Sequence, residues 1–149
     1  MDLLSKLKND YPNLNFEEGI SYYWSPERGT VYFVGDDMQI SGQWSLLHEV
    51  GHALLTHQKY SSDFELLQLE MEAWEEAVKL SKAYRVKIPN NHVQDCLDTY
   101  RDWLHARGRC PKCEAQGLQT TSKQYSCLRC GSKWQVSSAK FCRPYRRKV

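Results

Sequence analysis

The sequence predicts an α+β protein in which a short β-hairpin precedes several helices and a small cysteine-containing module ends the chain. Two runs of aromatic and β-branched residues flank a loop that contains Pro26 and Gly29, which is typical of a hairpin. Apolar residues then recur with helical spacing as far as residue 107. From Cys110 onward this periodicity stops, and turn residues and short β-prone runs replace it.

Start and stop signals give the predicted bounds of each element. Ser41 or Gly42 can open the first long helix, and Ser62 or Asp63 can cap the second, with Glu65 near the capping-box position. The predicted strands cover residues 21–24 and 30–34, and the predicted helices cover residues 3–8, 43–57, 62–84 and 92–108.

Charge divides the chain into two parts. Residues 1–100 contain 8 Lys and Arg against 16 Asp and Glu, a net charge of −8, whereas residues 101–149 contain 12 against 2, a net charge of +10. Such asymmetry suggests two modules with different partners, and we place them at residues 1–107 and 108–149. The sequence contains no apolar run near the roughly 18 residues that a membrane span needs. We therefore expect a cytoplasmic protein with no membrane partner.

The first long helix places three polar side chains in an otherwise apolar stretch, residues 45–57. His48, Glu49 and His52 form the pattern H-E-x-x-H. On a helix the two histidines project within about 40° of each other, so both imidazoles can reach one metal ion. Zinc is the favoured candidate because imidazole suits it and because three protein ligands leave one position open for water. Glu49 is then the expected general base of a peptide-bond hydrolase.

The third ligand has to come from elsewhere. His57 lies about 180° from His48 if the helix continues, so we expect it to face away from the metal, as a helix C-terminal residue. In the next helix Glu72 is favoured, and Glu76 is expected to orient a zinc histidine from behind. Glu70 or a later glutamate remains an alternative. Glu72 and Glu76 project together beside a stripe of Leu69, Ala73, Ala77 and Leu80.

Two motifs in this order resemble a known family. "HEVGHALLTH" followed by "EMEAWEEA" resembles the ImmA/IrrE-type zinc metallopeptidases, over roughly residues 30–80. The resemblance implies a small zincin-like domain with zinc on His48, His52 and Glu72 and with Glu49 catalytic. It also implies protein substrates that include DNA-bound transcriptional repressors. On this interpretation, strand 30–34 is a candidate edge strand with which an extended substrate pairs.

Two alternatives stay open. SprT-like proteases also combine a small H-E-x-x-H domain with a C-terminal zinc ribbon, and they act on proteins crosslinked to DNA. From a different class, the chain could be a non-catalytic, zinc-containing adaptor that binds nucleic acid.

Four cysteines carry the second metal motif. Cys110, Cys113, Cys127 and Cys130 form two C-x-x-C pairs, which supply four thiolates for a closed, tetrahedral zinc site. The segment that contains them is too small to bury a sufficient core, so zinc would supply much of its folding free energy. We therefore predict a zinc ribbon and two zinc ions per chain, one catalytic and one structural.

Basic and aromatic residues are interleaved around these cysteines, a composition that suits phosphate contact and base stacking. We predict DNA or RNA contact by the ribbon, with a structural cap or a protein-docking module as the alternative. The candidate contact residues are Arg129, Lys133, Arg143, Arg146, Arg147 and Lys148, with Arg107, Arg109, Lys112 and Lys123 as further cations and with Tyr125, Trp134, Phe141 and Tyr145 as the aromatics.

Overall fold

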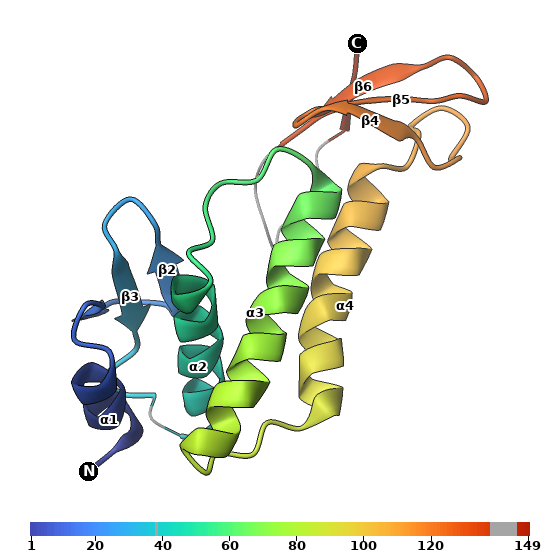
Figure 1. Cartoon of the computed structure of the whole chain (residues 1–149). Helices are drawn as coiled ribbons and strands as arrows, with labels where there is room; N and C mark the ends of the chain where they lie inside the picture. The colour runs from blue at the N-terminus through green and yellow to red at the C-terminus, as the bar shows by residue number, and fades with distance from the viewer. Residues whose placement is uncertain (38, 138–145) are drawn as a thin grey trace. The chain divides into compact units, whose positions relative to one another are not determined.

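The computed structural model describes residues 1–37, 39–137 and 146–149 and confirms the α+β class (Figure 1). The chain forms two compact units, residues 1–59 with 69–93 and residues 60–68 with 94–149. Helices α3 (Asp63–Ala83) and α4 (Asn90–Arg107) contribute residues to both. The division at residue 107 that the charge pattern suggested stays a prediction. Among the described residues, no helix combines the length and apolarity that crossing a membrane requires.

The first unit contains a three-stranded sheet in the order β1-β3-β2. As predicted, β2 (Tyr23–Ser25) and β3 (Thr30–Phe33) form an antiparallel hairpin. On the other side of β3 lies β1 (Asn15–Glu18), which runs parallel to it. The expectation that residues 30–34 form an edge strand is therefore wrong, because β3 is the central strand. Only four residues long and largely exposed, β1 lacks the apolar alternation that reveals a strand in a sequence.

The first long helix, α2 (Ile40–Leu54), packs on this hairpin. Its residues Leu46, Leu47 and Val50 are fully buried, as is Val31 of β3. Ahead of the sheet, α1 (Leu3–Asp10) extends the predicted helix by two residues.

A tight turn closes α2 three residues earlier than predicted. Thr56 adopts a left-handed conformation with φ 52°, and its N–H donates to the carbonyl of Ala53 over 3.1 Å. The next N–H, that of His57, donates to the carbonyl of His52 over 3.0 Å. These two bonds define a Schellman motif, in which the chain folds back over the last helical turn. His57 therefore does not continue the helix.

The N-terminus of α3 carries the predicted capping signals. The Ser62 hydroxyl accepts from the N–H of Glu65 over 3.1 Å, and the Glu65 carboxylate accepts from the N–H of Ser61 over 2.7 Å. The first bond satisfies a backbone donor that the first helical turn leaves free, and the second connects Glu65 to a residue ahead of the helix.

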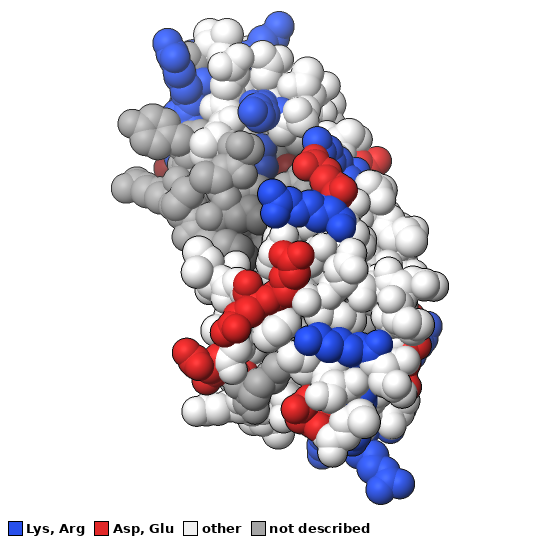
Figure 2. All heavy atoms as spheres, turned by 90° about the vertical axis from the view of Figure 1, so that its left-hand side faces the viewer, with Lys and Arg blue, Asp and Glu red and all other residues white. Residues whose placement is uncertain are grey.

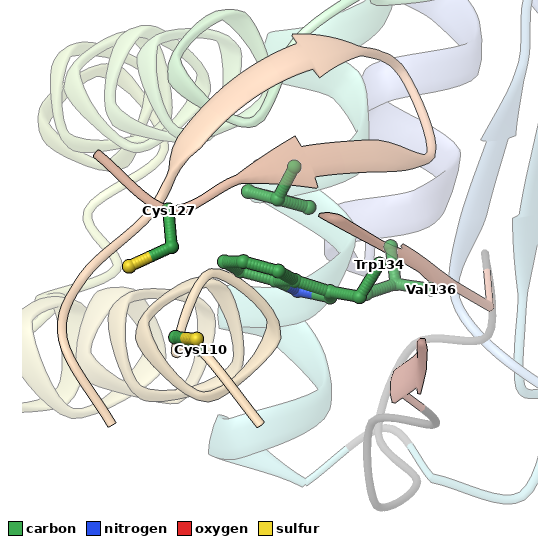
Figure 3. Packing of buried hydrophobic residues seen from close by; sticks show 5 residues of the cluster. Cys110, Cys127, Trp134 and Val136 are labelled. Atoms are coloured by element: carbon green, nitrogen blue, oxygen red, sulfur yellow. The ribbon is translucent and has the colours of Figure 1, made fainter. Parts of the chain in front are cut away.

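In the second unit, the cysteine-rich segment folds as a ribbon-like antiparallel sheet in the order β4-β5-β6-β7. Trp134 is fully buried at its centre, where it stacks on Tyr125 with ring centroids 5.6 Å apart. Figure 3 shows the indole beside Cys110 and Cys127. The small core of this module therefore adjoins its cysteines. The strands are β4 (Leu118–Thr121), β5 (Gln124–Ser126), β6 (Lys133–Val136) and β7 (Arg146–Lys148).

Candidate metal centres

Two helices bring three buried ligand atoms together in the first unit. His48 and His52 project from one face of α2, and their Nε2 atoms lie 3.1 Å apart. The Glu70 carboxylate of α3 spans them, with Oε2 3.0 Å from Nε2 of His48 and Oε1 3.2 Å from Nε2 of His52. All three residues are buried. The predicted histidine pair is thus joined by one carboxylate in a group that can hold a metal ion.

The structure places Glu70 at this position rather than the favoured Glu72. The two glutamates are two residues apart, about 200° around a helix, so they cannot face the same neighbour. Glu70 lies on the buried face with Ala73, Trp74 and Ala77, and its side chain is 6% exposed. The Glu72 side chain is 42% exposed. The structure thus brings Glu70, and not Glu72, to the two histidines, because Glu70 is the carboxylate that interrupts an apolar stripe at helical spacing.

Because α2 and α3 pack closely, the Glu70 side chain can reach the two histidines. Gly51 lies between them on α2, and a Cβ added there would lie 2.6 Å from the carbonyl oxygen of Ala73 on α3. Trp74 stacks on the His48 ring with centroids 4.2 Å apart. Trp74 was not among the sequence-predicted site residues, although it follows Glu70 by one helical turn.

Electrostatics hold Glu70 ionised inside the protein. Burial by itself would raise the pKa of this carboxyl, but hydrogen bonds from His48 and His52 lower the pKa well below its usual range. A buried carboxylate facing two imidazole nitrogens is a donor set that suits a divalent cation such as zinc.

Glu49, the predicted general base, is fixed by the hairpin. Its Oε2 accepts from the backbone N–H of Trp24 over 2.9 Å. Because this N–H bonds to Glu49, it points away from β3 toward the open edge of β2. Glu49 therefore lies at the free edge of the sheet, next in sequence to a candidate metal ligand.

A third histidine, His57, contacts His52 at Nδ1, the ring nitrogen that does not contact Glu70. Nδ1 of His57 lies 2.9 Å from Nδ1 of His52, and its Nε2 lies 3.1 Å from Oε2 of Glu72. Burial and the neighbouring His52 lower the pKa of His57, against the opposing effect of Glu72. Glu76, which was expected to orient a ligand, instead pairs with Lys79 at 3.6 Å on its own helix. The residues behind His52 are therefore His57 and Glu72.

The four predicted cysteines form the second candidate metal centre. The sulfur atoms of Cys110 and Cys130 are 3.6 Å apart, and those of Cys113 and Cys127 are 3.5 Å apart. Backbone N–H groups point at the sulfurs, as in the 3.5 Å contact from Cys113 to Cys110 and the 3.5 Å contact from Cys130 to Cys127. Hydrogen bonding by Ser132 lowers the pKa of Cys130 to about 6. The chemistry of this group suits a closed zinc site.

Several of the predicted nucleic-acid residues have structural roles instead. Tyr125 and Trp134 are core residues, so their rings are not available for base stacking. Arg107 is also buried, where its guanidinium pairs with Asp63 at 3.4 Å and donates to the carbonyl of Ser122. Residues 138–145, which include Arg143, Phe141 and Tyr145, lie outside the described residues.

The exposed cations of the ribbon lie on different surfaces. Arg129, Lys133, Arg146 and Arg147 are exposed. Arg147 pairs with Gln135 across the sheet and Arg146 with Val136, so these two arginines face opposite sides. The Arg146 guanidinium also donates to the carbonyl of Arg109 over 2.6 Å. Figure 2 shows that both basic and acidic side chains are exposed on the face of the molecule that it draws.

The fold and the two sites define an α+β chain with a buried His-His-Glu group and a four-cysteine cluster. Comparisons with family models, with curated proteins and with solved structures found no match.

Proposed function

We propose that this protein is a zinc-dependent metallopeptidase whose zinc is held by His48, His52 and Glu70. The observation that supports the proposal best is the convergence of these three buried side chains, with Glu49 next in sequence to His48 and held by the Trp24 N–H. It keeps the chemistry that the ImmA/IrrE resemblance implies and moves the third ligand from Glu72 to Glu70.

The distances in both groups suit zinc. Nitrogen and oxygen ligands at about 2.05 Å from a tetrahedral ion lie about 3.3 Å from one another, and thiolates at about 2.3 Å lie about 3.8 Å apart. The histidine-glutamate atoms are separated by 3.0–3.2 Å. The paired sulfurs are separated by 3.5 and 3.6 Å. The two imidazole Nε2 atoms lie 3.1 Å apart, so a proton on each would set two N–H donors against each other, whereas two lone pairs can share one cation.

The chain's own residues divide the remaining work. When bound, zinc supplies Lewis acidity that polarises a peptide carbonyl and acidifies a water molecule. The Trp24 N–H holds one oxygen of Glu49, which leaves the other free to accept the proton of the attacking water. Glu49 then delivers this proton to the leaving amine.

The proposed substrate is a protein bound to DNA, such as a transcriptional repressor. The resemblance to ImmA/IrrE-type peptidases supports this class, and the basic ribbon supports an encounter on nucleic acid. Cleavage confined to protein crosslinked to DNA would favour the SprT-like alternative, and zinc binding without cleavage would favour the adaptor.

Ligand identity is tested by metal content. We expect two zinc ions per wild-type chain and one in Glu70→Ala, because that change removes a ligand while the four cysteines remain. Glu72→Ala should keep two at saturating zinc. Elemental analysis of the purified proteins measures this, and two ions in Glu70→Ala would exclude Glu70 as an essential ligand.

Catalysis is tested by Glu49→Gln, which keeps an oxygen to accept from Trp24 but is not a base. We expect unchanged zinc content and a loss of peptide cleavage of at least about 100-fold, assayed on a proteome-derived peptide library. Equal cleavage by both proteins would contradict the proposed mechanism.

A further inference from the structure

We propose that His57 and Glu72 are positioning residues that orient His52 toward the metal, a role that rests on the proposed function. They form a chain of contacts behind the ligand. His52 faces Glu70 through Nε2, and its Nδ1 lies 2.9 Å from Nδ1 of His57. The chain ends at Glu72, whose Oε2 lies 3.1 Å from Nε2 of His57.

Only one proton arrangement makes all of these contacts favourable with a metal ion bound. A histidine that binds a metal through Nε2 keeps its proton on Nδ1, so His52 donates to His57. His57 accepts on Nδ1 and must then carry its own proton on Nε2. That proton points at Glu72, whose carboxylate accepts hydrogen bonds without donating any. The contacts thus fix the tautomer of His52 that presents a free Nε2 lone pair to the site.

The two histidine ligands differ in how they are held. Nδ1 of His48 is buried and has no hydrogen-bond partner among the described residues, and its ring is held by stacking on Trp74. His52 has the polar support that metal-binding histidines usually have. Loss of His57 should therefore affect zinc binding through His52 alone.

Two hydrogen bonds hold the backbone of His57 in place: its N–H donates to the carbonyl of His52, and its carbonyl accepts from the Trp24 indole over 3.0 Å. The backbone N–H of the same Trp24 holds Glu49. One residue of β2 therefore anchors both the general base and the histidine behind the ligand.

The test compares variants of the full chain that keep different halves of the contact. Asn at position 57 places its amide oxygen near the position of Nδ1, where it can accept from His52. Gln places its amide near Nε2, where it reaches Glu72 but not His52. We expect His57→Ala and His57→Gln to weaken zinc binding at this site about 10- to 100-fold. His57→Asn should restore most of the affinity.

Zinc affinity is measured by competition with a chromogenic chelator, and the absorption spectrum of cobalt-loaded protein reports ligand geometry. A His48→Ala/His52→Ala variant gives the contribution of the cysteine site, which is subtracted. His105→Ala controls for loss of an exposed histidine. On α3, Glu72→Ala should weaken binding more than Glu72→Gln, which keeps an acceptor oxygen, and Glu75→Ala should leave it unchanged.

The outcomes separate this proposal from the function on which it rests. A wild-type chain with no zinc beyond that of the cysteine site overturns the proposed function. Zinc binding by the wild type with equal affinity in His57→Ala overturns only the positioning role. If His57→Ala does not fold, the Asn and Gln variants decide, because equal affinities for these two also overturn it.

Discussion

Three residues adopt left-handed backbone conformations beside the candidate metal centres. Thr56, with φ 52°, closes the turn that returns His57 to His52. Glu114, with φ 65°, and Gly131, with φ 77°, each follow the second cysteine of a C-x-x-C pair. For residues other than glycine, this backbone conformation costs about 1–2 kcal/mol. Both cysteine turns therefore need the same backbone, which suits Gly131 and strains Glu114.

The two cysteine turns should respond oppositely to substitution. Gly131→Ala should lower the free energy of unfolding by about 1–2 kcal/mol, and Glu114→Gly should raise it by up to about 1 kcal/mol. A Cβ at position 131 meets no atom within 4 Å, so the cost is that of the backbone alone. Denaturant titration of the zinc-loaded protein measures both.

Glu114→Ala is the control for this pair of variants. It removes the exposed ion pair with Arg109, at 3.2 Å, but keeps a Cβ, so it should be nearly neutral. Destabilisation by Glu114→Gly would contradict the strain argument.

In the first candidate metal centre, the pair of histidines could be predicted from the sequence, whereas the residues that contact them were harder to predict. The spacing of His48 and His52 fixes their common face, whatever the rest of the fold does. The choice of Glu70 depended on which helix face is buried, and the sequence offered that signal in Ala73, Trp74 and Ala77. The role of His57 depended on a left-handed threonine, which a sequence pattern does not predict.

Among the elements, the approach of α2 to α3 sets the geometry of the first site. Gly51 occupies a position where the two helix backbones lie close together, and a Cβ there would overlap the Ala73 carbonyl. Helix backbones cannot be compressed, so any larger residue must push the helices apart. His48 and His52 would then move away from Glu70.

We therefore expect Gly51→Ala to destabilise the protein by about 1–3 kcal/mol and to weaken zinc binding at the histidine site. Thermal unfolding and chelator competition measure the two effects. Gly19→Ala is a suitable control, because its Cβ would meet the Tyr32 side chain at 3.4 Å, an ordinary contact. Unchanged zinc affinity in Gly51→Ala would show that the helices tolerate the side chain without moving the ligands.

Helices were the elements that the sequence predicted best, because their periodicity and caps are local. The hairpin was also found from its own residues and loop. The strand β1 was not predicted, because its four mostly exposed residues carry no local strand pattern. Its pairing with β3 is a long-range contact. That omission also made β3 look like an edge strand.

For the whole molecule, the division of charge remains the main argument for a nucleic-acid partner. The +10 net charge of residues 101–149 is large for so short a segment. The structure removes Arg107, Tyr125 and Trp134 from the candidate contacts by burying them. What remains exposed on one face of β6 and β7 includes Lys133 and Arg147, since Lys133 alternates with the buried Trp134 and Arg147 pairs with Gln135.

This remaining surface predicts a salt-dependent interaction of the full chain with DNA or RNA. Binding should weaken steeply as salt rises, because each phosphate contact releases counterions and adds about 0.9 to the slope of log K against log salt. Replacing both Lys133 and Arg147 with Ala should flatten the slope by up to about two units. Replacing Lys59 and Lys79, which are exposed but belong to the acidic part of the chain, should leave it unchanged. Fluorescence anisotropy with a labelled duplex and a labelled single strand measures these slopes. If neither probe binds at about 50 mM salt, where such contacts are strongest, the nucleic-acid interpretation is wrong, and a structural cap or a protein-docking module is left.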